Sequence, residues 1–415
     1  MRSDNPIEHL LRTEAPQVLG ALTRRFGRFS LAEDAVQEAL LVAGRRWPTE
    51  GIPAEPRTWL IRVGYRKMVD LLRSDNARGR REYIVGTDEL AMRAPERAVP
   101  AVSAQDDSLT LLVLCCHPCL TPTSRAALTL RAVGGLRTAE IAHAYGVSEA
   151  TMATRISRAK QRLRDSGARF AAPTAADEEP RYASVLQVLY LMYSEGYVVT
   201  AGRELGRVDL AAEAIRLTRM LCRERPEDAE AAGLLALMLL TEARRDARTG
   251  HDGTLVPLER QDRTRWNSEL IAEGTRILDE VWTRGSAGQY RLQAAIAAVH
   301  AQAVTDGTTD WRQIAVLYLW LERLAPTNPV RLSRVVAVSQ AFGARRGRAL
   351  LEQLDIEHGL AADPLVRQRF LAVRAHLHEE LGRPDLAARD YREAATLTDN
   401  EAEKQYLLAR AADSE

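Results

Sequence analysis

The stretch from Arg137 to Leu163 constrains the fold more than any other part of the chain. Its apolar residues predict two short helices with these inward-facing side chains: Ile141, Ala142 and Tyr145 in the first, and Met152, Ile156, Ala159 and Leu163 in the second. Between the helices, Gly146 can take the positive φ at which a helix stops, Val147 can fill the space between the helices, and Ser148 can cap the second. The pattern predicts a helix-turn-helix.

The outward face of the second helix suits contact with DNA. It carries small or forked polar groups that fit base edges and phosphates, namely Glu149, Thr151, Thr154, Arg155 and Arg158. From Arg137 to Arg169 there are seven Lys/Arg and three Asp/Glu. An ordinary hairpin with a solvated basic face is the alternative, but the glycine-hydrophobe-serine turn is more specific than charge alone.

Charge divides the chain into two parts with opposite character. At 415 residues, two to four domains are expected. Residues 1 to 169 hold 26 Lys/Arg and 19 Asp/Glu, a net charge of +7, whereas residues 170 to 415 hold 31 and 37, a net charge of −6. A basic front suits nucleic acid, and an acidic rear does not.

The sequence predicts no membrane partner. No segment approaches the roughly twenty uninterrupted apolar residues that span a bilayer, and the N-terminus is too polar for a secretory signal. We therefore expect a cytoplasmic protein. The carboxylates and histidines share no catalytic spacing, so we expect neither an enzyme nor a cofactor.

Three of the four cysteines cluster with a histidine, at Cys115, Cys116, His117 and Cys119. A zinc site is one interpretation. However, adjacent cysteines cannot easily both turn to one tetrahedral ion, and no second Cys/His group follows at finger spacing. The favoured alternative is a buried helix end stopped by Pro118.

Residues 8 to 47 contain two helical patterns broken at residues 27 to 30. In the second, Ser30 is expected as the N-cap, with Glu33 at the spacing of a capping box. Its apolar face leaves a polar stripe made of Asp34, Gln37 and Glu38. Such a stripe is either simply solvated or a docking surface for a basic partner helix.

After a Pro/Gly-rich loop at residues 48 to 56, aromatic and basic residues alternate along a third helix. The basic residues are Arg57, Arg62, Arg66, Lys67, Arg73, Arg78, Arg80 and Arg81. Positive charge suits a phosphate backbone, and flat rings suit unstacked bases. Trp59 itself is expected in the core rather than as a stacking platform, because its neighbours are apolar.

Three motifs in order carry a resemblance to a known family: AEDAVQEALL, then PRTWLIRVGYRKMVDLLR, then LTPTSRAALTLRAVGGLRTAEIAHAYGVSEATMATRISRAKQRLR. Over residues 10 to 165 the chain resembles the extracytoplasmic-function (ECF) sigma factors of bacterial RNA polymerase. The resemblance implies core RNA polymerase as partner, through its β′ clamp coiled coil and its β flap. It also implies promoter DNA, both double-stranded and melted.

The resemblance also implies residue roles. It assigns polymerase binding to Asp34, Gln37 and Glu38. It assigns the minus-ten element to Trp59, Arg62, Tyr65, Arg66, Lys67 and Arg73. It assigns the minus-thirty-five element to Arg137, Ser148, Glu149, Thr151, Thr154, Arg155 and Arg158.

The rear of the chain is helical in pattern throughout. Helices are expected at residues 209–224, 227–247, 265–282, 290–303, 310–324, 330–341, 345–357 and 365–381. The stretch LGRPDLAARDYREAATL is spaced like the second half of a tetratricopeptide repeat, which predicts a short helical solenoid. Tyr190, Tyr193 and Tyr197 form either a partner-binding ridge or packing between helices.

The rear also resembles that of the ECF subgroup with a C-terminal tetratricopeptide-like domain, in which the extension is expected to control activity. Ser333 stands where that pattern has Asn. A protein partner or an intramolecular partner for this domain is therefore expected.

The predicted fold is all-α, with two small helical sigma domains followed by a solenoid. The expected parts are sigma region 2 at 8–81, a linker at 82–106, sigma region 4 at 107–169, a linker at 170–180, and the solenoid at 181–415.

The predicted function is promoter-specific initiation of transcription, modulated by the rear domain. A free-standing helix-turn-helix regulator whose repeat domain senses a ligand or partner is the alternative, although it has no use for the acidic stripe or the helix at Trp59. A tetratricopeptide scaffold would leave the turn at Gly146 unexplained.

Overall fold

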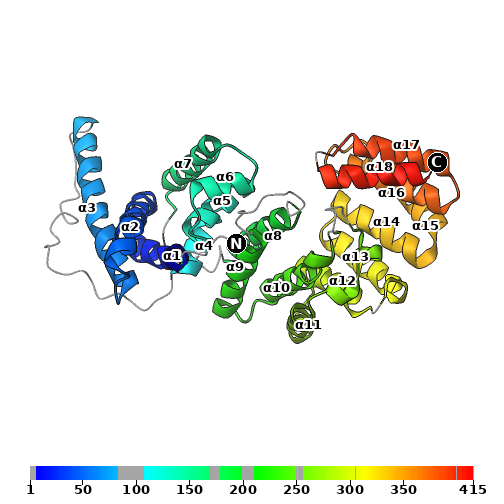
Figure 1. Ribbon diagram of the computed structural model, residues 1–415, viewed down its shortest axis with the longest axis horizontal. Helices are drawn as coiled ribbons and strands as arrows, with labels where there is room; N and C mark the ends of the chain where they lie inside the picture. Colours follow the sequence, from blue (N-terminus) through cyan, green and yellow to red (C-terminus); the bar gives the residue numbers. More distant parts are fainter. Residues whose placement is uncertain are drawn as a thin grey trace. The chain divides into compact units, whose positions relative to one another are not determined.

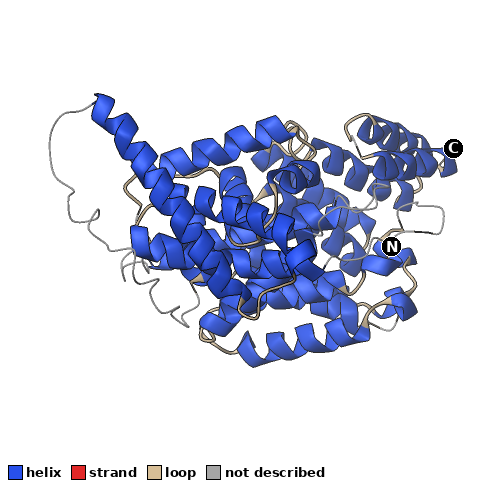
Figure 2. Cartoon of the chain, turned by 60° about the vertical axis from the view of Figure 1, so that its left-hand side comes forward, coloured by secondary structure: helices blue, strands red, loops and turns tan. Residues whose placement is uncertain are grey.

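The computed structural model describes residues 6–82, 107–168, 170, 178–198, 210–248, 250, 256–303, 305–398 and 400–414. The described residues form α-helices, short 3-10 turns and loops, and none of them lies in a β-strand (Figures 1 and 2). The all-α prediction is therefore confirmed. Most residues of both expected linkers lie outside the described ranges.

The chain divides into two compact units. Unit 1 comprises residues 1–195 and 205–217, and unit 2 comprises residues 196–204 and 218–415. No helix in the described part of the chain is long and apolar enough to cross a bilayer.

Unit 1 begins with three helices that pack on one another: α1 (Pro6–Phe26), α2 (Phe29–Glu50) and α3 (Pro56–Glu82). Their core is apolar and includes Val18, Leu22, Val36, Leu60 and Met68. α1 and α3 approach closely at Gly64, where a Cβ atom would lie 2.9 Å from Leu22 Cδ1. Only glycine fits this crossing without displacing a core side chain.

The start and the end of α2 differ from the sequence expectation. The helix begins one residue before Ser30, because the Ala32 amide already donates to the Arg28 carbonyl at 3.0 Å. Ser30 therefore lies inside the helix and cannot be its cap. At the other end the helix continues through Pro48 and stops at Gly51, whose φ is +86°. The loop predicted from residue 48 is correspondingly shorter.

Four further helices of unit 1 follow: α4 (Ser108–Cys115), α5 (Pro122–Ala132), α6 (Thr138–Ala144) and α7 (Glu149–Asp165). α4 ends where the cysteine cluster begins, and both Cys115 and Cys116 are fully buried. Burial raises the pKa of the Cys116 thiol to about 12, even though Thr129 and Arg125 act in the opposite direction. The two residues behave as the apolar end of a helix, which confirms that interpretation.

The rear of the chain forms successive antiparallel helices. α8 (Glu178–Val198) lies mostly in unit 1, and α9 (Leu210–Glu224) crosses between the units. Unit 2 continues with α10 (Ala229–Glu242), α11 (Ser268–Trp282), α12 (Gln289–Gln302), α13 (Trp311–Leu324), α14 (Asn328–Phe342), α15 (Ala344–His358), α16 (Arg367–Glu380), α17 (Pro384–Ala395) and α18 (Glu401–Asp413). The 3-10 turns are Arg245–Ala247, Leu258–Arg260, Arg263–Arg265 and, before α13, Asp306–Thr308.

Several consecutive helices of unit 2 pack in pairs, and α10 packs on α12 as well as on α11. The closest pairs include α13 with α14, α16 with α17, and α17 with α18. In the tetratricopeptide-like stretch, Ala387, Tyr391 and Ala394 are buried in the core of the last hairpins. The helices predicted between residues 209 and 381 are observed, each within a few residues of its expected bounds except for the C-terminal end of α10, which stops at Glu242.

Candidate nucleic-acid interface

The turn between α6 and α7 has the predicted geometry. Gly146 takes a φ of +61°, in the left-handed region that favours glycine. The Ser148 hydroxyl accepts a hydrogen bond from the Thr151 amide at 3.2 Å, which caps α7. Met152, Ile156, Ala159 and Leu163 are all buried. The helix-turn-helix prediction is confirmed at these residues, whereas Tyr145, which follows the end of α6, and Val147 are only half-buried.

The opposite face of α7 is open to solvent. Glu149, Thr151, Thr154 and Arg158 are exposed, and Arg155 is half-buried. The Thr154 hydroxyl donates to the Ala150 carbonyl at 2.9 Å. α7 therefore presents hydroxyls, a carboxylate and two guanidinium groups on one surface, the chemistry of major-groove readout.

Arg137 lies at the start of α6, before the turn rather than on α7. Its amide donates to the Glu140 carboxylate at 2.7 Å, and its guanidinium lies 3.3 Å from the same group. This residue is thus tied to the N-terminus of α6.

The minus-ten candidates lie along α3. Arg62 and Arg66 are exposed. Lys67 lies 3.6 Å from Glu38 of α2, and Arg73 lies 3.9 Å from Asp70. Two candidate rings take part in packing: Trp59 meets the buried Trp47 edge-on at 5.5 Å, and Tyr65 lies 5.3 Å from Phe26.

The acidic stripe lies on α2 as predicted from its spacing. The side chains of Asp34 and Glu38 are about half exposed, at 49% and 54%, and Gln37 is half-buried. The stripe is not simply solvated, because Lys160 of α7 donates to the Asp34 carboxylate at 2.7 Å.

Beside the stripe lies Glu33, which the sequence pattern indicated only as part of a capping box and not as a binding residue. The Glu33 side chain is 3% exposed, and it accepts from Lys160 at 2.7 Å and from Arg131 at 2.9 Å. Arg131 comes from α5 and Lys160 from α7, so one buried carboxylate of the first three helices holds two cations of the helix-turn-helix part. We call Glu33, Asp34, Arg131 and Lys160 the clasp.

Within the clasp, Glu33 and Lys160 favour each other's charged form. Burial alone would raise the pKa of Glu33, but the charges and hydrogen bonds of Lys160 and Arg131 outweigh it and lower the pKa. For Lys160, burial lowers the pKa, and Glu33 with Asp34 outweighs it and raises the pKa. Each partner therefore favours the charged form of the other.

A second contact joins the same two parts of unit 1. Asp107, just before α4, is 5% exposed and accepts from the Arg24 guanidinium of α1. Next to it, the Gln17 side chain donates to the Ser108 hydroxyl at 3.1 Å. Gly20 of α1 faces the Asp107 side chain, which would overlap with any Cβ atom at this position.

Between α2, α3 and α7 lies an open groove of about 820 Å³. Its walls carry the stripe residues Asp34, Gln37 and Glu38 on one side and Ser157, Gln161 and Arg164 of α7 on the other. The polymerase-binding candidates thus face α7 across this groove.

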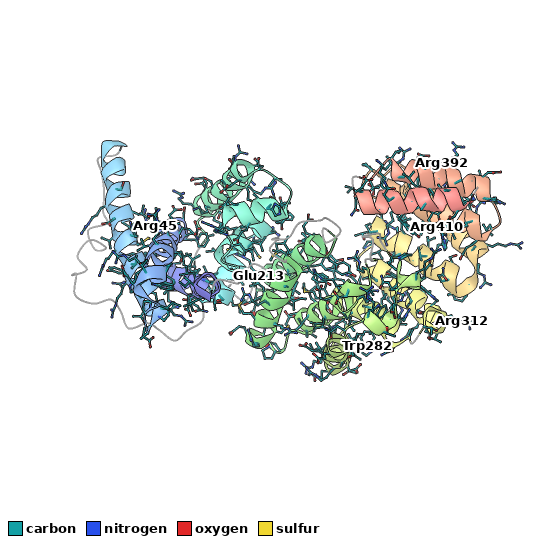
Figure 3. The ribbon with its side chains drawn as sticks, in the orientation of Figure 1. Arg45, Glu213, Trp282, Arg312, Arg392 and Arg410 are labelled. Carbon is teal, nitrogen blue, oxygen red and sulfur yellow. The ribbon has the colours of Figure 1, made fainter. Side chains whose placement is uncertain are left out.

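The first helices after the second expected linker contact the helix-turn-helix part. Arg216 of α9 donates to the Val133 carbonyl at 3.4 Å, and the same guanidinium pairs with Glu213 at 2.7 Å. Glu213 is labelled in Figure 3. A Cβ atom on Gly134 would come within 3.1 Å of its carboxylate. α9 is therefore fitted against the end of α5.

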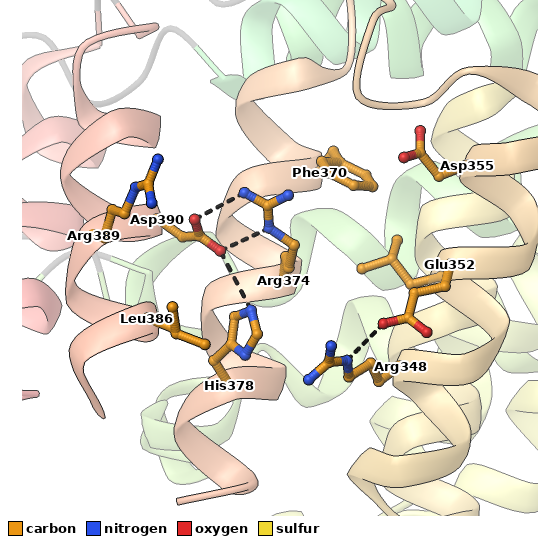
Figure 4. A pocket seen from close by; sticks show the side chains of 10 residues that line it. Arg348, Glu352, Asp355, Phe370, Arg374, His378, Leu386, Arg389 and Asp390 are labelled. Carbon is orange, nitrogen blue, oxygen red and sulfur yellow. Dashed lines mark hydrogen bonds and ion pairs between the residues drawn. The ribbon is translucent and has the colours of Figure 1, made fainter. Parts of the chain in front are cut away.

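Unit 2 holds a cavity of about 400 Å³ between α15, α16 and α17. At its base Arg374 donates two hydrogen bonds to the buried Asp390, at 2.7 and 2.8 Å, and His378 lies 3.7 Å from the same carboxylate (Figure 4). Burial lowers the pKa of His378, against the effect of Asp390. Positive and negative groups line this cavity in equal measure.

Comparison with known proteins agrees with this geometry. Residues 10–78 match the family model for sigma-70 region 2, and residues 110–163 match the model for sigma-70 region 4. Residues 181–282 match a family of unknown function, DUF6596. No solved structure matches the chain significantly.

Three relatives extend the comparison. The uncharacterized protein R00370 of Rhizobium meliloti (strain 1021) is 38% identical over 414 residues, which cover 97% of this chain and 94% of that protein. The ECF RNA polymerase sigma factor SigJ of Mycobacterium tuberculosis is 29% identical over 210 residues, covering 46% of this chain and 64% of SigJ. The ECF RNA polymerase sigma factor SigK of Mycobacterium ulcerans is 26% identical over 151 residues, covering 36% and 75%.

The two sigma regions lie in the predicted order, and the relative from Rhizobium meliloti shares nearly the whole chain. The chain therefore belongs to the ECF sigma factors, carries an additional C-terminal helical region, and is a factor that directs the initiation of transcription.

Proposed function

We propose that the protein binds core RNA polymerase through the stripe Asp34, Gln37 and Glu38, with the β′ clamp coiled coil as its partner. The supporting observation is that two carboxylates lie on one helix face and that each already holds a lysine from a different helix, Asp34 that of α7 and Glu38 that of α3. A surface that binds a basic helix within the chain is chemically suited to bind one on a partner. Region 4 would contact the β flap.

Promoter DNA would be bound at two places. We assign the minus-thirty-five element to the exposed face of α7, with Arg137 on a phosphate. We assign the melted minus-ten element to α3, where Arg62 and Arg66 are free to follow the backbone. Of the candidate rings, Tyr65 and Trp59 would stack on bases only after moving away from Phe26 and Trp47.

The protein would act by binding energy, without a catalytic residue or cofactor. Holding unpaired bases stabilises the open promoter, and the polymerase supplies the chemistry. Its place of action would be the cytoplasm.

In this proposal, residues 8–81 bind polymerase and the minus-ten element, and residues 107–169 bind the minus-thirty-five element. Residues 181–415 would support residues 107–169. The contact of Arg216 with Val133, next to Gly134, favours this role for the start of the C-terminal region. In unit 2, a protein partner would bind at the cavity beside His378, which is lined by polar and charged side chains.

The test is co-elution of the full chain with core polymerase, followed by a mobility shift on promoter DNA that contains an unpaired minus-ten segment. We expect a shift only when both proteins are present. A shift of duplex DNA by the chain alone, with no binding to polymerase, would instead favour a free-standing regulator.

A further inference from the structure

Unit 2 carries an exposed apolar row on α13. Val316, Trp320 and Leu324 are 47%, 46% and 56% exposed. They stand four residues apart, so they share one face of the helix over about 12 Å, at about 1.5 Å per residue. The core side of the same helix holds Ile314, Ala315, Leu317 and Leu321. A single exposed apolar side chain is ordinary, but three in a row on a well-packed helix are typical of a surface that a partner covers.

Two cations border the row along one edge. Arg312, labelled in Figure 3, and Arg323 lie eleven residues apart, close to about three helical turns, so both stand on the same edge of α13. Both side chains are exposed, and neither guanidinium group has a hydrogen-bond or ion-pair partner among the described residues. The row and these two residues form what we call the α13 strip.

The nearest carboxylates in the sequence are already engaged elsewhere. Glu322 is the one acidic residue within α13, and it pairs with Arg331 and Arg334 of α14, at 3.4 and 2.6 Å. Asp310, just before the helix, accepts the Gln313 amide at 3.0 Å as the N-cap. The rear part of the chain carries a net charge of −6, so the positive edge of the strip has the opposite sign to its own domain.

We propose that the α13 strip is a docking surface for an amphipathic helix of a partner protein, whose apolar face is bordered by acidic residues. Apolar side chains on such a helix would interdigitate with the row, and carboxylates beside them would pair with Arg312 and Arg323. Trp320, in the middle of the row, is the anchor, because a large ring at the centre of an interface loses the most water. This surface is separate from the acidic stripe of α2 and from the cavity beside His378.

Two other occupants fit the strip less well. When two copies pair with α13 antiparallel about a two-fold axis, the same edge of each helix meets, so all four guanidinium groups line up on one side and repel. An anionic membrane would attract the two cations but would repel a domain with a net charge of −6. The row also spans only nine residues, which is short for a helix that lies in a membrane surface.

The partner chemistry can be tested by selection on the purified full-length chain. The probe is a phage-displayed library of helical peptides in which one face is randomised. We expect the enriched peptides to share an apolar face with Asp or Glu along one edge. The selection is repeated on the charge-reversed double variant, Arg312→Glu with Arg323→Glu, which should enrich peptides that carry Lys or Arg at those positions instead.

Fluorescence anisotropy of an enriched acidic peptide then measures each variant. Trp320→Ala should weaken binding at least about tenfold, as expected for a central aromatic anchor. Trp282→Ala is its control, because this ring is 37% exposed but lies at the end of α11. The charge-reversed variant should bind the acidic peptide more weakly and a Lys-substituted version more tightly. Its control is Arg223→Glu with Arg345→Glu, which reverses two exposed cations elsewhere in unit 2 and should change neither affinity.

Several results would overturn the proposal. One is a selection that yields no peptide dependent on Trp320, and another is a charge-reversed variant that still selects acidic peptides. A dimer by light scattering that Trp320→Ala dissociates would show a second copy on the strip. Binding to phosphatidylglycerol vesicles that Trp320→Ala abolishes would show a membrane there. Circular dichroism verifies that each variant is folded, and co-elution with core RNA polymerase reports on the proposed function separately.

Discussion

The ammonium group of Lys160 lies 2.7 Å from the carboxylate of Asp34, and it links the helix that carries the promoter-reading face to the stripe assigned to polymerase docking. The two residues are 126 positions apart in the chain. Under the proposed docking role, a partner that takes Asp34 must displace Lys160, which would couple the two surfaces.

Reversing charge on the stripe should abolish polymerase binding. In the double variant Asp34→Lys and Glu38→Lys, two half-exposed carboxylates become cations, which repel a basic docking helix. Helix content should stay unchanged by circular dichroism, since neither side chain is in the core. Glu50→Lys, a somewhat more exposed carboxylate at the end of α2, is the control. If the folded double variant transcribed normally, the stripe would not be part of the polymerase interface.

Base readout and phosphate attraction should separate on α7. Arg155→Ala should relax the preference at one or two upstream promoter positions, at a cost of about 1 to 3 kcal/mol there. Arg162→Ala, on an exposed part of the same helix, should weaken all sequences alike. Binding to a library of upstream elements measures both effects. Equal, uniform losses from the two variants would mean that another face of α7 meets the DNA.

Removing the C-terminal region should lower promoter-specific transcription. Truncation after Pro180 deletes α9, and with it the Arg216 hydrogen bond to Val133 beside the helix-turn-helix. The comparison is run-off transcription with equal amounts of folded full-length and truncated protein. Output equal to or above that of the full chain would contradict a supporting role.

Acid should destabilise unit 2 through His300. This side chain is 9% exposed and lies edge-on to Trp311 at 5.1 Å. Burial, helped by the charges of Arg244 and Arg263, lowers its pKa to about 4 from the ordinary 6.5. Below pH 6.5 the unfolded chain therefore binds a proton that the folded chain resists, so stability is lost as the pH falls from 6.5 towards 4.

The loss amounts to at most about 3.5 kcal/mol, because the pKa drop from 6.5 to about 4 spans about 2.5 units of about 1.4 kcal/mol each. In the His300→Phe variant, the melting temperature of unit 2 should depend less on pH between pH 7 and pH 5. An unchanged slope in His300→Phe would contradict the assignment.

Local sequence rules predicted the helix-turn-helix because its geometry depends on neighbours. Gly146 needs its positive φ, and Ser148 caps a helix that starts at the next residue, so both signals lie within a few positions. The same rules failed at Ser30. Its side chain can cap, but the Ala32–Arg28 hydrogen bond starts the helix earlier.

The clasp could not be predicted in this way. Glu33 looks like part of a capping box, and Lys160 like one more cation on a basic helix. Their contact joins residues 127 positions apart, and nothing in either local pattern encodes it. Only the packing of α2 against α7 brings Glu33 and Lys160 together. Because the pair is buried, separating the two charges costs free energy.

Transcription from a genomic template library tests the central claim most directly. Core RNA polymerase is mixed with the purified full-length chain, and the 5′ ends of the transcripts are sequenced. We expect starts at a defined set of promoters that share upstream and minus-ten sequences, with changed upstream preference for Arg155→Ala and loss of all starts for the Asp34 and Glu38 reversal. Starts identical to those of core polymerase alone would contradict the assignment of this chain as a sigma factor.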